Sequence, residues 1–151
     1  MRAVVQRADS GSVVVDGAVV GQIGRGLVAF VGAEQGDEPA DLDYVLRKIV
    51  NLRVFEDAAG KLQHSVADID GELLVVSQFT LFGDTSRGNR PSFSRAMAPE
   101  PAKAMLFDFV TRARGVLKKV ETGVFGAHMI VTVVGNGPIT LQIDSRQKSS
   151  G

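Results

Sequence analysis

The most constraining stretch of the chain is a short aliphatic run near its middle, Leu73-Leu74-Val75-Val76. Four consecutive aliphatic side chains are typical of a strand that is buried on both of its faces. Such a run does not suit a strand with one solvent-exposed face, which would alternate apolar and polar residues. The run therefore predicts a strand in the interior of a sheet.

A row of polar and aromatic groups follows this run directly. Ser77-Gln78-Phe79-Thr80 presents a hydroxyl, a carboxamide, a ring and a second hydroxyl where the strand is expected to end. Sheet proteins often place ligands and reacting groups at strand ends. The alternative is a strand that fades into an ordinary loop. We treat these four residues as the candidate catalytic segment.

Length and composition exclude several kinds of site. The 151 residues fit one domain and can bury about two thirds of the surface of the unfolded chain. Cysteine is absent, which excludes disulfides, thiolate nucleophiles and cysteine-ligated zinc. With only His64 and His128, a histidine-rich metal site is not expected either. We therefore expect no metal site, and we expect no cofactor.

The first residues and the overall charge limit the possible partners. The segment 1–7 has arginines at positions 2 and 7 and no long apolar core, so we expect no signal peptide, no membrane anchor and a cytoplasmic protein. The 17 basic and 17 acidic residues cancel, which argues against coating nucleic acid with a globally basic surface. A local basic patch remains open.

Runs rich in branched residues, separated by turn residues, predict many strands. Asp16-Gly17 is the dipeptide best suited to a tight hairpin turn. The glycines at 21, 24 and 26 do not have the spacing of a dinucleotide-binding motif, and an apolar strand follows them, so we interpret them as turn residues. The expected strands are 3–5, 12–15, 18–20, 27–31, 52–55, 72–77, 120–122, 129–134 and 139–143.

Two segments have helical spacing of apolar residues. The first begins at Asp37-Glu38-Pro39 and carries an apolar stripe expected in the core: Leu42, Val45, Leu46, Ile49 and Val50. The second runs from about 100 to 117, and its expected core face comprises Ala104, Leu106, Phe107, Val110, Ala113 and Leu117. Together these elements predict a mixed α/β fold with one domain over 1–145. The tail 146–151 has no apolar anchor and is expected to be flexible.

The loop 83–94 combines glycines with arginines. Its first six residues imitate a phosphate-binding P-loop, but Asn89 and Arg90 stand where lysine and a hydroxyl are required, so a nucleotide hydrolase is not expected. Arg87 and Arg90, with Arg95 nearby, suit contacts with phosphate. For Arg90 the alternative is that it braces the loop by satisfying backbone carbonyls.

Gly135-Asn136-Gly137-Pro138 separates the last two expected strands. An ordinary turn is one explanation, because proline is tolerated at the first residue of a strand. A cis bond before Pro138 is the other. It would turn two adjacent carbonyls to one side and create a rigid acceptor pair that could fix the position of an amino group.

Several motifs occur together and in order: Met1-Arg2-Ala3-Val4-Val5-Gln6-Arg7, Lys48-Ile49-Val50-Asn51-Leu52-Arg53-Val54-Phe55, Val76-Ser77-Gln78-Phe79-Thr80-Leu81, Gly88-Asn89-Arg90-Pro91-Ser92-Phe93, Thr122-Gly123-Val124-Phe125-Gly126 and Asn136-Gly137-Pro138-Ile139-Thr140. Carrying them, the sequence resembles the D-aminoacyl-tRNA deacylase family, formerly called D-tyrosyl-tRNA deacylase, from Met1 to about Ser145. A sister family that edits L-alanine on threonine tRNA carries alanine where Phe79 stands, so Phe79 favours the D-specific branch. Gly135 departs from the common Asn-Asp-Gly-Pro order but leaves the Gly-Pro pair intact.

This resemblance implies a layered fold with largely antiparallel or mixed sheets, a barrel-like core and two main helices. It implies a hydrolase that cleaves the ester of D-aminoacyl-tRNA, and also glycyl-tRNA, and that acts as a homodimer on the aminoacylated 3′ end of tRNA, with no DNA and no membrane partner. Gly137-Pro138, joined by a cis bond, would enter the partner's site, hold the substrate's α-amino group and block an L side chain. Ser77, Gln78, Phe79 and Thr80 would form the floor of the site, Phe125 and Met129 a wall, and Arg7 would orient the Gly-Pro loop.

The hydrolytic step leaves two mechanisms open. Thr80 is one candidate nucleophile, although no histidine or lysine lies close to it in sequence to act as its base. The resemblance implies the other, in which the 2′-hydroxyl of the terminal ribose drives hydrolysis and the protein positions the ester. We favour the second because the base is missing. In both, backbone amides around Phe79 and Thr80 are candidate donors to the developing oxyanion.

Three rival hypotheses remain. A triad of Ser77, His128 and an acid would make a serine hydrolase, although a lone histidine is more often a surface or hydrogen-bonded residue. A serine esterase acting on small esters would need no tRNA. A tRNA-binding module without catalysis would bind with steep salt dependence and release no amino acid.

Overall fold

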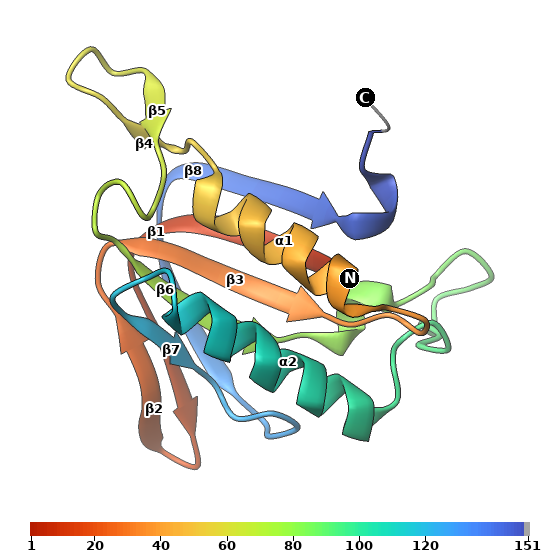
Figure 1. The fold of residues 1–151 in the computed structure, drawn as a ribbon. Helices are drawn as coiled ribbons and strands as arrows, with labels where there is room; N and C mark the ends of the chain where they lie inside the picture. Colours follow the sequence, from red (N-terminus) through yellow and green to blue (C-terminus); the bar gives the residue numbers. More distant parts are fainter. Residues whose placement is uncertain (150–151) are drawn as a thin grey trace.

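Residues 1–149, which the computed structural model describes, form a six-stranded mixed sheet with two helices lying against it (Figure 1). The strands of the sheet are β1 (Arg2–Val15), β2 (Ala18–Ile23), β3 (Gly26–Gly32), β6 (Glu72–Ser77), β7 (Val120–Thr122) and β8 (Ile130–Asp144). The helices are α1 (Pro39–Asn51) and α2 (Pro99–Arg114), and a separate hairpin pairs β4 (Phe55–Glu56) with β5 (Leu62–His64). The predicted mixed α/β fold with two main helices is confirmed, and the sheet curls toward a barrel.

Strand β1 organises the sheet because it pairs with three others. Its first half pairs with β3, its second half with β2, and nearly its whole length with β8. The sequence predicted two short strands, 3–5 and 12–15, where the structure has one long strand, and likewise two where β8 runs unbroken. The polar residues between the apolar runs stay in the strands because their backbone groups still find partners across the ladder.

The aliphatic run Leu73-Leu74-Val75-Val76 lies inside the sheet as predicted. Strand β6 is parallel to β3 on one side and to β7 on the other, and Leu73, Leu74, Val75 and Val76 are all buried. Because side chains alternate along a strand, Leu73 and Val75 pack in the main core beneath the helices. Leu74 and Val76 pack in a second cluster on the other face of the sheet.

The predicted buried face is correct for α1 and partly wrong for α2. All five residues of the predicted stripe of α1 are buried. Helix α2 instead buries Ala102, Leu106, Phe109 and Ala113. The prediction that Ala104 and Phe107 lie in the core was wrong, since both are exposed and Phe107 keeps 76% of its surface accessible. Both faces of this helix carry apolar residues, so periodicity alone could not choose between them.

The structure also differs from two further predictions, those for the segment 52–55 and for the tail 146–151. The strand predicted over 52–55 is reduced to the short β4, because only Phe55 and Glu56 find a partner strand in β5. Arg146, expected in the flexible tail, is anchored by ion pairs of 3.3 Å to Glu34 and to Asp37. These acids lie more than a hundred residues earlier, beyond the reach of local sequence patterns. Residues 150–151 lie outside the described residues, and the flexibility of the rest of the tail stays a prediction.

Candidate functional site

A groove of about 630 Å³ lies between α2 and the carboxyl-terminal ends of β6 and β7. Ligands of open α/β sheets commonly bind beyond the carboxyl ends of parallel strands, and β3, β6 and β7 are mutually parallel neighbours here. The groove is predominantly apolar. It is lined by Val75, Ser77, Glu100, Lys103, Ala104, Leu106, Phe107, Val110, Thr111, Arg114, Thr122, Gly123 and Phe125.

The candidate catalytic segment starts in this groove and continues past it. Ser77 is the last residue of β6 and lines the groove. The backbone N–H of Gln78 donates to the Val31 carbonyl at 2.9 Å. Phe79 and Thr80 open a single turn of 3₁₀ helix, η1 (Phe79–Phe82), and are exposed. The first amides of a helix have no acceptor within it, so the N–H groups of Phe79 and Thr80 are free to serve a ligand.

The side chain of Thr80 has a specific partner. Gln78 Nε2 donates a hydrogen bond to Thr80 Oγ1. A carboxamide does not take up a proton near neutral pH in either orientation. Gln78 therefore positions the Thr80 hydroxyl but cannot act as its general base.

Phe79 contacts a second aromatic residue, Phe93. The rings of Phe79 and Phe93 meet edge to face, with centroids 5.2 Å apart and an interplanar angle of 73°. Both rings remain partly exposed, so the segment presents an aromatic surface. The loop that carries Phe93 is closed by backbone hydrogen bonds between Asp84 and Ser92 in both directions.

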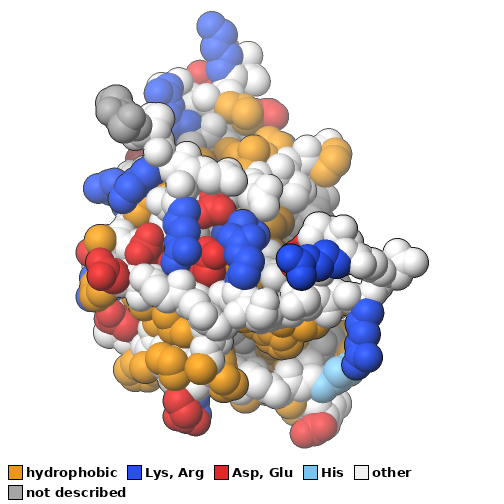
Figure 2. All heavy atoms as spheres, turned by 90° about the vertical axis from the view of Figure 1, so that its right-hand side faces the viewer, with side chains coloured by type: hydrophobic (Ala, Val, Ile, Leu, Met, Phe, Trp, Pro, Cys, Tyr) orange, Lys and Arg blue, Asp and Glu red, His pale blue; other side chains and the backbone are white. Residues whose placement is uncertain are grey.

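The three arginines of this region have different environments. Arg95 donates two hydrogen bonds, of 3.0 and 2.7 Å, to the buried carboxylate of Glu34, and these bonds raise the pKa of the guanidinium. Arg87 and Arg90 are exposed and have no ion pair or side-chain hydrogen bond within residues 1–149. Bracing of the loop by Arg90 thus finds no support among the described contacts. Figure 2 shows Lys and Arg side chains gathered above an apolar area on the right-hand face of the molecule as seen in Figure 1.

Gly137-Pro138 lies at a different place in the fold. In the β1–β8 ladder, Gln6 pairs with Thr140 and Ala8 with Gly135, so residues 136–139 bulge opposite the single residue Arg7. The Gly137–Pro138 bond is cis, and both residues are exposed. The expected turn between two strands is instead a bulge within one strand.

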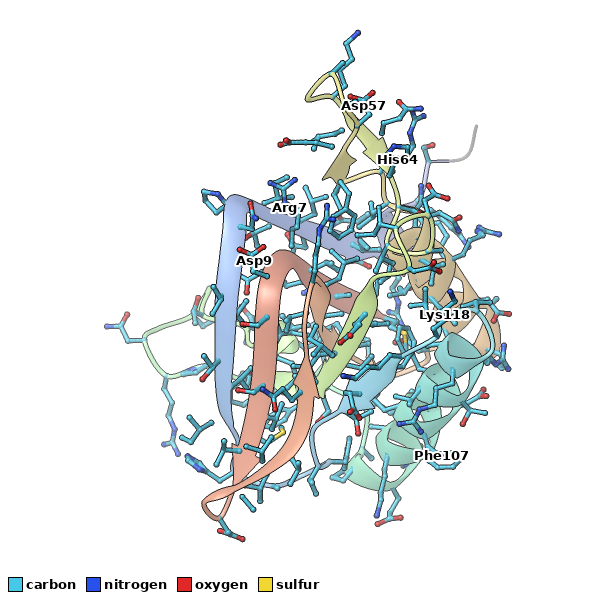
Figure 3. All side chains as sticks on the ribbon, turned by 90° about the vertical axis from the view of Figure 1, so that its left-hand side faces the viewer. Arg7, Asp9, Asp57, His64, Phe107 and Lys118 are labelled. Atoms are coloured by element: carbon cyan, nitrogen blue, oxygen red, sulfur yellow. The ribbon has the colours of Figure 1, made fainter. Side chains whose placement is uncertain are left out.

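Arg7 holds the base of this bulge. Its Nε donates to the Asn136 carbonyl at 2.9 Å, one terminal nitrogen to Asn136 Oδ1 at 3.2 Å, and the other to the Val54 carbonyl at 2.8 Å. Asn136 in turn donates to Asp9 Oδ1 at 2.8 Å. Figure 3 shows Arg7 and Asp9 together at one end of the sheet, well apart from Phe107.

Ser77 and the Gly-Pro bulge of one chain lie apart in the sheet. Ser77 pairs with Val31, which pairs with Ala3 of β1, whereas the bulge stands beside Arg7. Arg7 is four positions after Ala3 along the extended strand, a distance of about 13 Å. One chain therefore does not bring its own Gly137-Pro138 to its own Ser77.

The two predicted wall residues are placed differently. Phe125 lines the groove. Met129 does not, because its sulfur packs behind Gly123, where an added Cβ would collide with it. Glycine at 123 thus lets Met129 pack closely against this wall of the groove.

Neither histidine lines the groove with Ser77: His64 lies on β5, and His128 is exposed before β8. No hydrogen bond joins Ser77 to a histidine among residues 1–149, so the triad of Ser77, His128 and an acid finds no support in the described contacts. Residues 1–149 contain no group of three or more His, Asp or Glu side chains suited to hold a metal ion, and no helix among them is long and apolar enough to cross a membrane.

The α2 wall of the groove was missed from the sequence. Lys103, Phe107, Thr111 and Arg114 face the groove, yet Phe107 was assigned to the core. The available signal was the alternation of apolar and cationic residues at helical spacing, since a core stripe would not include Lys103 and Arg114.

Comparisons of the sequence with known proteins identify its family. The family model described as D-Tyr-tRNA(Tyr) deacylase matches residues 4–144. A relative from Clostridium acetobutylicum, named D-aminoacyl-tRNA deacylase, is 52% identical over 147 residues, which cover 97% of this chain and 99% of the relative. A relative of the same name from Thermosipho africanus is 48% identical, with the same coverage.

Two solved structures have similar folds. One, titled "c-Myc DNA Unwinding Element Binding Protein", superposes with a TM-score of 0.91 at 40% identity and covers 95% of this chain and 98% of its own. The other, titled as a "probable eukaryotic D-amino acid tRNA deacylase", has a TM-score of 0.78 at 19% identity with the same coverage, and it supports the fold alone.

Proposed function

The chain belongs to the D-aminoacyl-tRNA deacylase family, as its motifs predicted, and we propose that it hydrolyses the ester between a D-amino acid and the terminal ribose of tRNA. It is thus a carboxylic ester hydrolase. The observation that carries the proposal for this chain is the groove that opens beside Ser77, directly before the free amides of Phe79 and Thr80. Its volume suits a nucleoside-sized ligand, since binding sites for small ligands commonly measure about 300 to 1,000 Å³.

The terminal adenosine enters this groove between Ser77 and Phe125. The ester carbonyl then reaches the start of η1, where the amides of Phe79 and Thr80 donate to the oxyanion that forms when the ester is attacked. Donors placed at such a position stabilise the transition state more than the ground state. Gln78 and Thr80 form the rest of the floor, and their mutual hydrogen bond fixes both side chains.

Hydrolysis is driven by the 2′-hydroxyl of the terminal ribose rather than by Thr80. Two observations support this mechanism. The Thr80 hydroxyl is bonded to the side-chain amide of Gln78, which cannot act as a base, and no histidine lines the groove. Water attacks the ester carbon, the 2′-hydroxyl of the substrate activates that water, and the bond to the 3′ oxygen breaks to release the amino acid and the 3′-hydroxyl of the tRNA; the protein contributes position and oxyanion stabilisation.

Chiral selection requires a second copy of the chain. Gly137-Pro138 of the partner closes the site, and its carbonyls accept hydrogen bonds from the α-ammonium group of the substrate. An L side chain would collide with this Gly-Pro pair, whereas glycine and D residues fit. Two observations support this arrangement: the bulge is exposed, and the strand register keeps it away from Ser77 of its own chain. Exposed Ile130, Val134 and Leu141 on β8 give the second copy an apolar surface to cover.

Arg87 and Arg90 contact phosphates of the tRNA. Their guanidinium groups are exposed on the loop that follows η1, so they stand beside the path that the nucleic acid takes into the groove. We place the protein in the cytoplasm, where aminoacyl-tRNA is used for translation. DNA is not part of this proposal, although one relative is titled for binding a DNA element. An excess of unmodified duplex DNA is therefore expected to leave deacylation unchanged.

One assay separates the proposed function from its rivals. The protein is incubated with D-tyrosyl-tRNA and, separately, with the ethyl ester of D-tyrosine, and release of the amino acid is followed. We expect release from the tRNA alone. Cleavage of the ethyl ester at a comparable rate would indicate a general esterase, and binding of tRNA without release would indicate a non-catalytic module.

A further inference from the structure

The groove extends along much of α2. Its lining residues on this helix run from Glu100 to Arg114, which at the helical rise corresponds to about 21 Å. The proposed function uses Ser77 and Phe125 for the terminal adenosine and assigns nothing to the α2 wall. Stacked nucleotides rise by about 3.4 Å each, so this wall has room for more than one base.

The α2 wall presents an exposed ring between polar groups. Lys103, Phe107 and Thr111 follow one another at intervals of four residues and therefore form one stripe on the helix. Phe107 is the most exposed large hydrophobic residue of the described chain, at 76%. An aromatic ring at the mouth of a groove, one helical turn from a lysine, is typical of sites that stack single-stranded bases and hold their phosphates.

The charges around α2 show that the groove has free positive charge. On another part of the helix, Arg112 pairs with Asp43 and Asp108, and beyond its end Lys118 pairs with Asp70. Lys103 has no ion pair among residues 1–149, and Arg114 donates only to the Val120 carbonyl. Glu100 is the one acid among the lining residues, so the wall carries a net positive charge suited to a polyanion.

From this stripe we infer that α2 binds the nucleotide preceding the terminal adenosine, with its base stacked on Phe107 and its phosphate paired with Lys103. The inference rests on the proposed function, because it extends the same substrate one nucleotide further along the same groove. A substrate that ends at the adenosine lacks this nucleotide and cannot make the contact with α2. The protein therefore distinguishes tRNA from aminoacyl-adenosine through α2.

The test compares two substrates that share the ester but differ in the nucleotides beyond it. D-tyrosyl-tRNA and 3′-O-D-tyrosyl-adenosine are hydrolysed by the wild type, by Phe107→Ala and by Lys103→Gln, and kcat/KM is measured for each. We expect the ratio of kcat/KM on tRNA to kcat/KM on the adenosine ester to fall about tenfold in each variant, because one stacked base or one phosphate contact is lost. Phe107→Trp, which keeps a stacking ring, restores the wild-type ratio.

A matched control and a second readout make the result specific. Lys118→Gln removes one positive charge next to the same helix but outside the groove, and it leaves the ratio unchanged. Figure 3 shows Lys118 and Phe107 on separate parts of this side of the molecule. For Lys103→Gln, the slope of log(kcat/KM) on tRNA against log salt concentration becomes shallower by about 0.7, the value for one contact with a single strand.

The possible failures are distinguishable. If the wild type cleaves neither substrate, the proposed function is wrong and the inference falls with it. If the wild type cleaves both but the variants change the two substrates equally, or change neither, the inference alone is overturned. A shift of Phe107→Ala to a smaller oligomer in sedimentation would also overturn it, because the ring would then belong to a subunit interface.

Discussion

Removing the guanidinium of Arg7 tests how the Gly137-Pro138 bulge is held. In Arg7→Met the stem is retained, but three hydrogen bonds are lost, two to Asn136 and one to the Val54 carbonyl. A hydrogen bond from a charged donor contributes about 1.5 to 3 kcal/mol, with less expected where water can replace it. The bonds to Asn136 are exposed and the one to Val54 is partly buried, so we expect a total loss of about 2 to 3 kcal/mol.

Urea unfolding measures this loss, and single-turnover hydrolysis of D- and L-tyrosyl-tRNA measures its consequence for selection. A loosened bulge no longer blocks the L side chain firmly, so the ratio of D to L rates is expected to fall at least tenfold. Lys61→Met is the control, because Lys61 is exposed, its side chain has no described partner and it has no role in the proposed site; its unfolding free energy changes by less than about 0.5 kcal/mol. If Arg7→Met behaves like Lys61→Met in both assays, Arg7 does not hold the bulge.

Three further predictions follow from single residues. Phe109→Ala costs about 3 to 5 kcal/mol of unfolding free energy because its ring is fully buried, whereas Phe107→Ala costs less than about 1 kcal/mol; equal losses in thermal unfolding would show that the orientation of α2 is wrong. Burial raises the pKa of Asp144, but hydrogen bonds from the Arg146 amide and Arg2 outweigh it and bring the pKa below 3.8. The folded form therefore gains stability from Asp144 above this pH and loses it as the pH falls through the lowered pKa, so Asp144→Asn flattens the acid side of a stability curve measured by urea unfolding; an unaltered curve would contradict the shift. Thr80→Ala retains most single-turnover activity on D-tyrosyl-tRNA, whereas a substrate with a 2′-deoxy terminal adenosine is not hydrolysed; the opposite pair of results would establish Thr80 as the nucleophile.

The parts of the fold that follow from local patterns were predictable. The run Leu73-Leu74-Val75-Val76 predicted a doubly buried strand, and the stripe of α1 has one apolar face, so its burial follows from its spacing. Helix α2 has two apolar faces, and only packing decides that Phe109 is buried and Phe107 exposed. The lengths of β1 and β8 could not be predicted either. Their polar middle sections stay extended because they pair with neighbouring strands, not because they carry apolar side chains.

The site was predictable at its strand end and not elsewhere. Ser77 follows a recognisable strand, so its place at the sheet edge could be inferred. The distance between Ser77 and Gly137-Pro138 depends on the register of three strand pairs, which no local pattern encodes. The groove wall was missed for the same reason as the orientation of α2, since an apolar residue at helical spacing is usually in the core.

Selectivity between the two stereoisomers of one substrate tests the central claim most directly. D- and L-tyrosyl-tRNA, prepared on the same tRNA, are incubated with the protein under single-turnover conditions, and the rate of amino acid release is measured for each. The proposal predicts rapid release from the D substrate and no release above the spontaneous rate from the L substrate. Equal rates for both would contradict chiral selection at this site, and release from neither would contradict the activity itself.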